Sequence, residues 1–374
     1  MGDVVKEITR NDPESEAPIM MITANNGFIE QSERYAFNNA GESLKKYILL
    51  KKGELAYNHG ASKLRPYGSC FALTTAENAR IPFVYHCFSA ENQNAEFMSI
   101  ELNGAEIENQ LRKIVSSGAR MDGLLNISFD EYTSVSVLLP GTEEQDRIAD
   151  FFRHLDNLIT LHQRKYDKLT KVKKSMLEKM FPKNGANVPE IRFKGFSDAW
   201  EQRKLGEMGQ TYTGLSGKTK DDFGHGQARF VTYMNVFSNP ISNPEMTEPI
   251  EIDPKQNEVE VGDVFFTTSS ETPEEVGMSS ILLEKRGKTY LNSFCFGFRP
   301  SEKIDSYYLA YMLRSESARA KITLLAQGIS RYNISKNKVM EIAVSLPSLD
   351  EQKMIGQYFS QLDNLITLHQ YKCI

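Results

Sequence analysis

The chain has 374 residues, of which 40% are hydrophobic and 25% charged, so it is long enough for two globular domains with separate cores. No stretch approaches the roughly 18 consecutive apolar residues of a membrane span, and we expect neither a signal peptide nor a transmembrane helix. The net charge of −5 argues against a strongly basic nucleic-acid-binding protein.

Residues 1–140 have the composition of a first α+β domain. Asn103-Gly104 interrupts a helical pattern over residues 95–117, which predicts two short helices rather than one. Segments rich in β-forming residues and bounded by turn residues predict strands at residues 20–29, 45–58, 67–76, 81–90 and 132–140.

A long helix follows at residues 141–182. No glycine or proline lies between Glu143 and Met180, so the sequence allows one helix of roughly 38 residues, about 57 Å long. Its apolar positions alternate in steps of four and three, which is the a and d spacing of a coiled coil. These seam positions are Ile148, Phe152, Leu155, Ile159, His162, Tyr166 and Leu169.

The sequence LDNLITLHQ occurs twice, at residues 155–163 and 362–370. The identity continues outward at a constant offset, because Glu144-Gln145 has its counterpart in Glu351-Gln352. We infer an internal duplication of a whole domain with its helix. The seam of the second helix, which we assign to residues 348–374, consists of Ile355, Phe359, Leu362, Ile366 and His369.

A linker at residues 183–200, rich in proline, glycine and asparagine, separates the two halves. Residues 201–347 then repeat the plan of the first domain with little residue identity, and a helical pattern recurs at residues 306–327. Residues 333–335 match residues 126–128 as Asn-Ile-Ser. This pattern predicts one scaffold that presents two different surfaces.

Two divergent domains, each closed by Leu-Pro and a helix of the LPxxxEQxxIxxFFxxLDxxI type, resemble the specificity (S) subunit of type I restriction-modification enzymes. Residues 181–207 are similar to the junction before the second domain of that family, and residues 267–275 resemble another of its segments. The resemblance covers essentially the whole chain. Family members usually begin with a segment like residues 192–205, and the second helix here stops early, so we expect a truncated or naturally short form.

The resemblance implies an α+β fold in which two structurally similar target-recognition domains are separated by two long antiparallel helices. These helices would form a coiled coil with pseudo-two-fold symmetry. The implied function is non-catalytic recognition of double-stranded DNA, each domain reading one half of a bipartite asymmetric site. The coiled coil would set the spacer and dock methyltransferase (M) subunits, two of them, with restriction (R) subunits completing the nuclease. S-adenosylmethionine, and ATP with Mg, are expected on these partners and no cofactor on this chain.

Base recognition needs donors and acceptors on protruding loops, with arginine suited to guanine and asparagine to adenine. Loops that place such residues beside glycine are the best candidates, because the backbone can approach DNA closely there. For the arginines the alternative is a structural ion pair, and for the others an ordinary solvated surface. The candidates are Asn58, Lys63, Arg65, Arg120, Ser216, Lys218, Lys220, Arg229, Ser269, Ser270, Thr272, Ser330 and Arg331.

His162 and His369 occupy equivalent seam positions and could bind a metal or sense pH. We favour packing residues of a polar layer, because antiparallel helices need not bring equivalent positions together. The cysteines have no metal-ligand spacing, so we expect reduced thiols in a cytoplasmic protein with no metal site. They are Cys70, Cys87, Cys295 and Cys373.

Catalytic motifs are missing from the sequence. There is no Pro-Pro for the loop of adenine methyltransferases and no GxxxxGK[ST] phosphate loop. The competing hypothesis is a duplicated coiled-coil scaffold that bridges partner proteins without touching nucleic acid, which the net charge of −5 would suit. Salt-dependent, sequence-dependent DNA binding would distinguish the two.

Overall fold

The structure is a computed structural model. It describes residues 1–24, 27–34, 41–115, 124–183 and 185–372. The chain divides into two compact units, Met1–Leu158 and Ile159–Ile374. Helix α5 (Thr142–Lys179), 38 residues long as the sequence predicts, crosses the boundary between these units. None of the described helices is long and apolar enough to cross a membrane.

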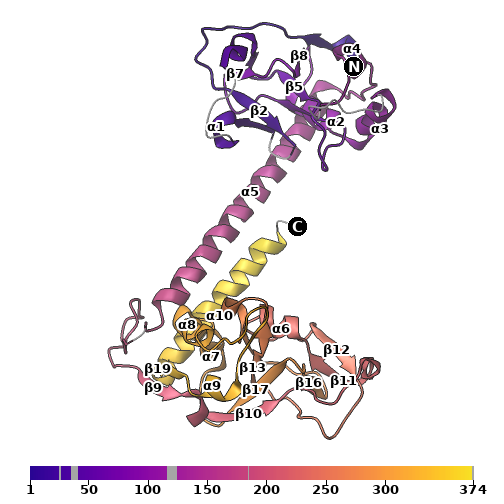
Figure 1. The fold of residues 1–374 in the computed structure, drawn as a ribbon. Helices are drawn as coiled ribbons and strands as arrows, with labels where there is room; N and C mark the ends of the chain where they lie inside the picture. Colours follow the sequence, from indigo (N-terminus) through magenta and orange to yellow (C-terminus); the bar gives the residue numbers. More distant parts are fainter. Residues whose placement is uncertain (25–26, 35–40, 116–123, 184, 373–374) are drawn as a thin grey trace. The chain divides into compact units, whose positions relative to one another are not determined.

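Unit 1 is built on a four-stranded antiparallel sheet in the order β1-β8-β5-β6 (Figure 1). These strands are β1 (Val5–Glu7), β8 (His86–Ala90), β5 (Leu55–Asn58) and β6 (Ser69–Ala72). Two antiparallel strand pairs, β2 with β3 and β4 with β7, contribute to a second small core. Their bounds are β2 (Met20–Thr23), β3 (Gly27–Glu30), β4 (Ile48–Lys51) and β7 (Asn78–Ile81).

Besides α5, three helices contribute buried residues to the main core of unit 1, namely α2 (Ala95–Leu102), α3 (Ala105–Ile114) and α4 (Phe129–Thr133). The other helices of the unit are η1 (Gly2–Val4), α1 (Gln31–Arg34) and η2 (Gly41–Lys46). The break predicted at Asn103-Gly104 falls between α2 and α3, as expected. Glycine suits that break because a helix interior disfavours it.

Unit 2 has a four-stranded antiparallel sheet in the order β10-β17-β13-β15. Its strands are β10 (Gly209–Thr213), β17 (Cys295–Pro300), β13 (Val264–Thr267) and β15 (Ser279–Ile281). A three-stranded sheet has the order β12 (Thr247–Ile250), β11 (Phe223–Val231), β16 (Thr289–Leu291). Two two-stranded sheets pair β14 (Ser269–Ser270) with β18 (Tyr332–Asn333), and β19 (Ala343–Leu346) with β9 (Glu201–Lys204).

The helices of unit 2 follow the same succession as those of unit 1, with a pair of helices after the sheet and one short helix later. They are η3 (Leu205–Glu207), η4 (Lys220–Asp222), α6 (Tyr233–Ser238), η5 (Pro273–Glu275), α7 (Ser306–Met312), α8 (Glu316–Thr323), α9 (Lys336–Met340) and α10 (Leu349–Tyr371). The sheets correspond strand for strand, β1-β8-β5-β6 to β10-β17-β13-β15. One backbone plan is therefore used twice.

The Glu-Gln motif of each repeat attaches the long helix to its own domain in the same way. Gln145 accepts a hydrogen bond from the backbone N–H of Asn94, the N-cap of α2, and donates to the carbonyl of Pro140. Gln352 accepts one from the N–H of Asp305, the N-cap of α7, at the same 3.0 Å distance. Both glutamines are buried, so an unpaired amide there would be costly. This shared joint explains why the motif recurs.

The two long helices run antiparallel where α5 and α10 meet in unit 2 (Figure 1). His162 of α5 contacts His369 of α10, and further along α5 Lys173 forms an ion pair with Asp363 at 2.5 Å. The numbering rises on one helix while it falls on the other. The predicted α+β class, with two domains of one plan and two long antiparallel helices, is confirmed.

The strand predicted at residues 132–140 is wrong. Tyr132 belongs to helix α4, because Ser128 and Glu131 form a capping box that starts this helix at Phe129. The following segment corresponds to β19, which is a strand because it pairs with β9. No described strand pairs with residues 136–139, so this segment lacks the ladder hydrogen bonds that define a strand.

Candidate nucleic-acid interface

Residues 328–331 of unit 2 form a protruding loop. The backbones of Gln327 and Asn333 exchange two hydrogen bonds, of 2.9 and 2.8 Å, that close it at its base. Gly328 has φ +145°, and a Cβ there would lie 2.0 Å from the carbonyl oxygen of Arg331, so only glycine fits. Ile329 at the tip is 96% exposed. The Gly-Ile-Ser-Arg sequence therefore makes a tight turn that projects side chains into solvent.

Arg331 in this loop keeps its charge available. Its guanidinium carbon lies 5.9 Å from the ring centroid of Phe294, a cation–π contact, and its Nη2 is 3.4 Å from the hydroxyl of Ser269. Among the described residues no carboxylate pairs with Arg331. Ser330 beside it is exposed as well. A guanidinium oriented by an aromatic ring but not neutralised can donate to a guanine edge or a phosphate.

Three other candidates from the sequence, Ser269, Ser270 and Thr272, lie in or next to β14, close to this loop. Ser269 lies in β14, and its carbonyl accepts a 2.6 Å hydrogen bond from the hydroxyl of Tyr233. Ser270 donates to the carbonyl of Thr272, and Thr272 donates to Glu275 at 3.0 Å. These hydroxyls fold the loop rather than face solvent as free donors.

Sequence reasoning missed Phe294 and Tyr233. Phe294 is 55% exposed. Its backbone N–H donates a 2.8 Å hydrogen bond to the side-chain oxygen of Asn292, which forms a turn. The available signal was an aromatic residue directly after the polar pair Asn292-Ser293. A large apolar side chain in a polar turn indicates a candidate for an exposed contact residue. Nothing in the sequence links Tyr233 to Ser269, since that contact is tertiary.

The lysine-rich loop at residues 213–220 is partly neutralised. Lys218 is 12% exposed and pairs with Asp253 at 2.9 Å and with Asp222 at 3.7 Å. The hydrogen bond to Asp253 raises the pKa of Lys218 above its usual value. Lys220 is exposed and has no ion-pair partner among the described residues, and Ser216 is also exposed. Of the three candidates in this loop, Ser216 and Lys220 thus remain accessible to a ligand, and Lys218 does not.

Arg229 is a structural residue of the β11–β12 pair. Its Nε donates to the hydroxyl of Thr247 at 2.6 Å, and its Nη2 donates to the carbonyl of the same residue. Thr247 opens β12, the antiparallel neighbour of β11. The guanidinium of Arg229 thus connects two strands. Because its donors are used there, it is less able to bind a phosphate than the guanidinium of Arg331 is.

In unit 1, Asn58 and Arg65 are both occupied inside the protein. The amide of Asn58 donates to the carbonyl of Ile22 at 3.0 Å and accepts from the N–H of Gly60 at 2.9 Å. Arg65 donates to the carbonyl of Asn103 at 2.7 Å. Both side chains hold loops in place.

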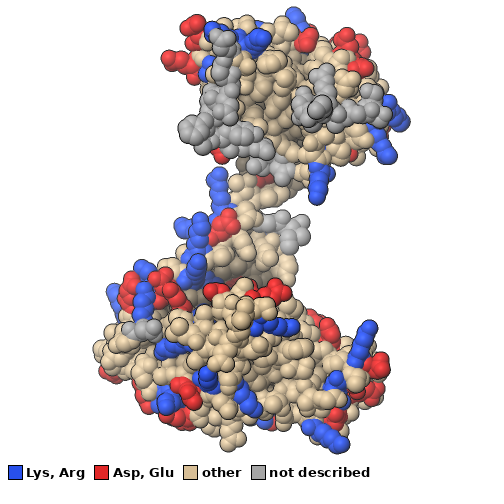
Figure 2. All heavy atoms as spheres, viewed as in Figure 1, with Lys and Arg blue, Asp and Glu red and all other residues tan. Residues whose placement is uncertain are grey.

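Lys63 is the accessible cation of that region. It lies at the tip of a turn beside Leu64, which is 59% exposed, and no described residue forms an ion pair with it. Arg120, the candidate equivalent to Arg331, lies outside the described residues. On the face drawn in Figure 2, basic and acidic side chains are mixed over each unit rather than gathered into one basic area.

The seam residues differ in burial between the two copies. Ile355, Phe359 and Leu362 are almost fully buried, whereas Phe152 is 43% and Leu155 38% exposed. Ile148 packs partly against the main core of unit 1, Ile159 is exposed, and Ile366 is half-buried. The seam predicted by the repeat is therefore closed around α10 and open on the first part of α5.

His162 and His369 come together within unit 2. Their Nδ1 atoms are 2.8 Å apart, so one donates and the other accepts, and at least one ring is neutral. Desolvation, with Lys372, His369 and Lys165 nearby, lowers the pKa of His162. The described residues contain no group of three or more potential metal ligands, and the lysines oppose a cation.

We expect this pair to make the stability of unit 2 fall as the pH drops below about 6.5. Unfolded His162 takes up a proton near its ordinary pKa of 6.5, but folded His162 does so only at lower pH. The unfolded state therefore binds more protons in that window, and stability is lost. Urea unfolding at about pH 5.5 and 7.5, followed by Trp200 fluorescence, should show a weaker pH dependence for His162→Asn/His369→Asn than for the wild type. An equal dependence would contradict the assignment.

The cysteines that the structure describes are buried and free. They are Cys70, Cys87 and Cys295. Burial raises the pKa of the Cys70 thiol to about 12, so it stays protonated at neutral pH. These residues are packing groups rather than nucleophiles.

Comparison with known proteins identifies related sequences. Residues 197–373 match the family model of the type I restriction modification DNA specificity domain. The type I restriction enzyme MjaVIII specificity subunit of Methanocaldococcus jannaschii is 24% identical over 270 residues, which is 68% of this chain and 61% of that protein. The putative MjaX specificity subunit of the same organism is 25% identical over 256 residues, 65% of this chain and 56% of that protein. The chain thus spans less than two thirds of these relatives.

Solved structures share the fold over the whole chain. A chain from a study of complex assembly and conformational transition of the type I R-M system has a TM-score of 0.52 at 16% identity, covering 99% of this chain and 91% of that one. The HsdS subunit from Thermoanaerobacter tengcongensis has a TM-score of 0.50 at 16% identity, covering 100% and 90%. The family model over residues 197–373, the two sequence relatives and the structure from Thermoanaerobacter tengcongensis agree with one another, so the chain is similar to specificity subunits of type I restriction-modification systems.

Proposed function

We propose that the chain recognises DNA sequence for a type I restriction-modification complex and has no catalysis of its own. The observation that carries this proposal is the loop at residues 328–331, which lies in the specificity domain. It presents Arg331 to solvent over an aromatic ring, and none of the residues that the structure describes is an acidic partner of it. Arginine with two donors in a fixed fork is the side chain that most often reads guanine.

Each unit would read one half of a bipartite site. The two sheets have the same strand order, but the loops they carry differ, so the two half-sites should differ in sequence. The coiled coil of α5 and α10 would set the spacer between the two half-sites. Methyltransferase subunits, two per chain, would dock on the helices and bind S-adenosylmethionine, and restriction subunits would bring ATP and Mg.

The direct test is Arg331→Ala in the complex with its methyltransferase subunits, read out by mapping methylated adenines. We expect relaxed recognition at one position of one half-site, with about 1–3 kcal/mol of discrimination lost there, because a bidentate contact to a base is removed. The other half-site should stay intact. Arg286→Ala is the matched control, since Arg286 is exposed but already paired with Glu245 and Glu284. Equal loss on both half-sites would contradict base reading by Arg331.

Salt dependence separates DNA recognition from the scaffold alternative. Binding of the complex should weaken steeply with salt, with a slope of log K against log[salt] of about −0.9 for each phosphate contact. If Arg331 contacts a phosphate instead of a base, Arg331→Ala lowers the magnitude of that slope by about one and weakens all sequences alike. A bridging scaffold would show neither salt-dependent nor sequence-dependent DNA binding.

A further inference from the structure

The loop at residues 328–331 carries an apolar side chain at its tip that the proposed contact of Arg331 does not use. Ile329 is 96% exposed, more than any other large apolar side chain that the structure describes. A single exposed apolar residue is common on protein surfaces and identifies no function by itself. Ile329 is informative because it lies two residues before a free guanidinium, on a loop that is firmly held.

The backbone beneath Ile329 is restrained from both sides. Gln327 and Asn333 exchange the two hydrogen bonds that close the loop, and Asn333 belongs to β18, which pairs with β14. Gly328 adopts a conformation that excludes a Cβ, because one would lie 2.0 Å from the carbonyl oxygen of Arg331. A loop restrained in this way loses little conformational entropy when its tip contacts a ligand. The loop is thus preorganised to present Ile329.

Phe294, which lies against Arg331, is fixed by the same framework. Thr268 donates to the carbonyl oxygen of Phe294 with its backbone N–H and with its hydroxyl, each at 2.9 Å. The N–H of Ile334, just after β18, donates to the carbonyl oxygen of Thr268 at 2.9 Å. One hydrogen-bonded unit therefore holds the ring that orients Arg331 and the strand that carries the loop. The isoleucine and the guanidinium are placed together.

The chemistry of the major groove limits what an isoleucine can contact there. Each base pair presents hydrogen-bond donors and acceptors at that edge, and the apolar group among them is the C5-methyl of thymine. An isoleucine against an amino, carbonyl or ring-nitrogen group removes water from that group without replacing its hydrogen bond, which is unfavourable. Against the thymine methyl no hydrogen bond is lost, and apolar surface is removed from water. Isoleucine at this edge therefore favours a T·A pair.

The spacing along the loop relates such a contact to the base that Arg331 reads. Cα atoms of neighbouring residues are about 3.8 Å apart, so those of Ile329 and Arg331 are separated by at most about 7.6 Å. Successive base pairs of B-DNA lie about 3.4 Å apart along the helix axis. The two side chains can therefore reach base pairs that are adjacent or separated by one other pair.

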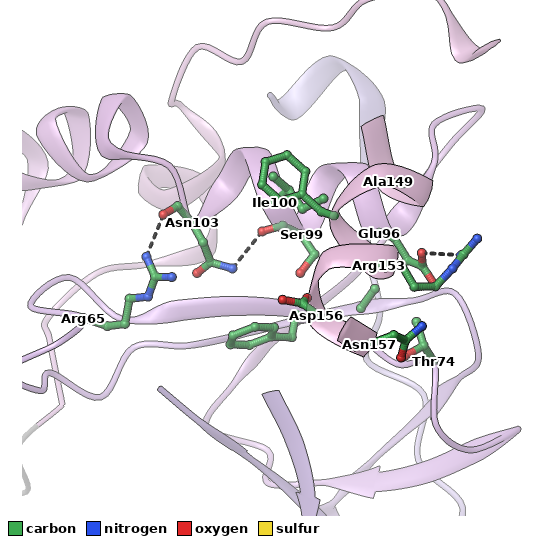
Figure 3. Close-up of a pocket in the computed structure, with 13 residues that line it drawn as sticks. Arg65, Thr74, Glu96, Ser99, Ile100, Asn103, Ala149, Arg153, Asp156 and Asn157 are labelled. Carbon is green, nitrogen blue, oxygen red and sulfur yellow. Dashed lines mark hydrogen bonds and ion pairs between the residues drawn. The ribbon is translucent and has the colours of Figure 1, made fainter. Parts of the chain in front are cut away.

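Unit 1 has an exposed apolar tip without this combination. Leu64 is 59% exposed in a turn between β5 and β6, which a 3.0 Å hydrogen bond from the N–H of Ser62 to the carbonyl of Arg65 closes. Arg65 lines a groove of about 400 Å³ and donates to the carbonyl of Asn103 at 2.7 Å, as Figure 3 shows. The guanidinium next to Leu64 is thus engaged inside unit 1, and Leu64 can serve as a control for Ile329.

We propose that Ile329 is a specificity-determining residue that contacts the C5-methyl group of a thymine in the half-site of unit 2. This thymine lies within two base pairs of the base that Arg331 contacts. The contact rests on the proposed function, because it requires the loop to face the major groove of the recognised DNA. It adds the chemical content of the half-site, since one position next to the base read by arginine is a T·A pair.

The test is a double-mutant cycle between protein and DNA, carried out with the complex of the chain and its methyltransferase subunits. Duplexes carry deoxyuridine in place of each thymine of the recognition site in turn, which removes only the methyl group. We expect one replacement, in the half-site that Arg331→Ala affects, to weaken binding by the wild type about fourfold, as the loss of one buried methyl predicts. The same replacement should change the affinity of Ile329→Ala by less than about 1.5-fold.

Two controls separate a base contact from other roles of the tip. Leu64→Ala removes an exposed apolar tip from the other unit and should keep the wild-type response to deoxyuridine. Ile329→Ala should match the wild type in circular dichroism and in assembly with the methyltransferase subunits, because the side chain is exposed. Weaker assembly in the absence of DNA would assign Ile329 to a protein contact and overturn the proposal.

The binding data also distinguish this proposal from the proposed function. Sequence-specific binding in which no deoxyuridine separates the wild type from Ile329→Ala overturns the thymine contact but leaves DNA recognition by the chain standing. The same holds if the half-site of unit 2 has no thymine within two base pairs of the position that Arg331→Ala relaxes. A complex without any sequence-specific DNA binding contradicts the proposed function itself, and the thymine contact with it.

Discussion

Arg192→Met is expected to lower the free energy of unfolding of unit 2 by about 3–5 kcal/mol. Arg192 comes from the linker and donates from Nε and Nη2 to the two carboxylate oxygens of Glu351, at 2.7 and 2.8 Å. Glu351 is only 1% exposed. Removing the guanidinium leaves a carboxylate buried without its partner, and the desolvation of that charge is no longer offset.

Urea unfolding followed by Trp200 measures this change, because the chain has one tryptophan and it lies buried in the core of unit 2. The repeat supplies the control. Glu144 is the equivalent of Glu351 but is exposed, so Glu144→Gln should change stability by less than about 0.5 kcal/mol.

A double variant, Arg192→Met/Glu351→Leu, should recover most of the loss, since an apolar pair can replace a buried ion pair. A loss below about 1 kcal/mol for Arg192→Met would show that water or another cation compensates Glu351.

The repeat made the long helices predictable from the sequence, whereas the pairing of strands could not be predicted from it. Residues 142–179 contain no helix breaker and carry a seven-residue pattern, so local information determines the helix. Residues 136–139 are similar in composition to β19, but a strand exists only where another strand supplies hydrogen bonds. That partner lies far away in sequence, and no local pattern reveals it.

For Arg331 the sequence predicted an exposed position on a loop, whereas for other candidates it did not reveal that the side chain is already occupied. Arg331 stood out because Gly328 requires a tight turn, and the structure places it on a protruding loop. Lys218 and Arg229 were selected by residue type, but Asp253 and Thr247 occupy them through tertiary contacts. Residue type therefore gives the chemistry a side chain is capable of, and only the fold shows whether its donors are already used.

Phe359→Ala should destabilise unit 2 by about 3–5 kcal/mol, because it removes a fully buried ring and leaves a cavity. Phe359 is 0% exposed and packs among Phe181, Tyr311 and Tyr358, at ring separations of 5.9, 5.2 and 5.3 Å. Unfolding in urea, monitored at Trp200, gives the loss directly. A loss under about 1.5 kcal/mol would mean that the aromatic cluster collapses into the space.

Phe152→Ala makes the same change at the equivalent position and should cost less than about 1 kcal/mol, because Phe152 is already 43% exposed and loses less burial. Circular dichroism at 222 nm in urea, which reports on both units, measures it. The same substitution at two equivalent positions of the repeat should therefore differ in its cost by the burial that each ring loses.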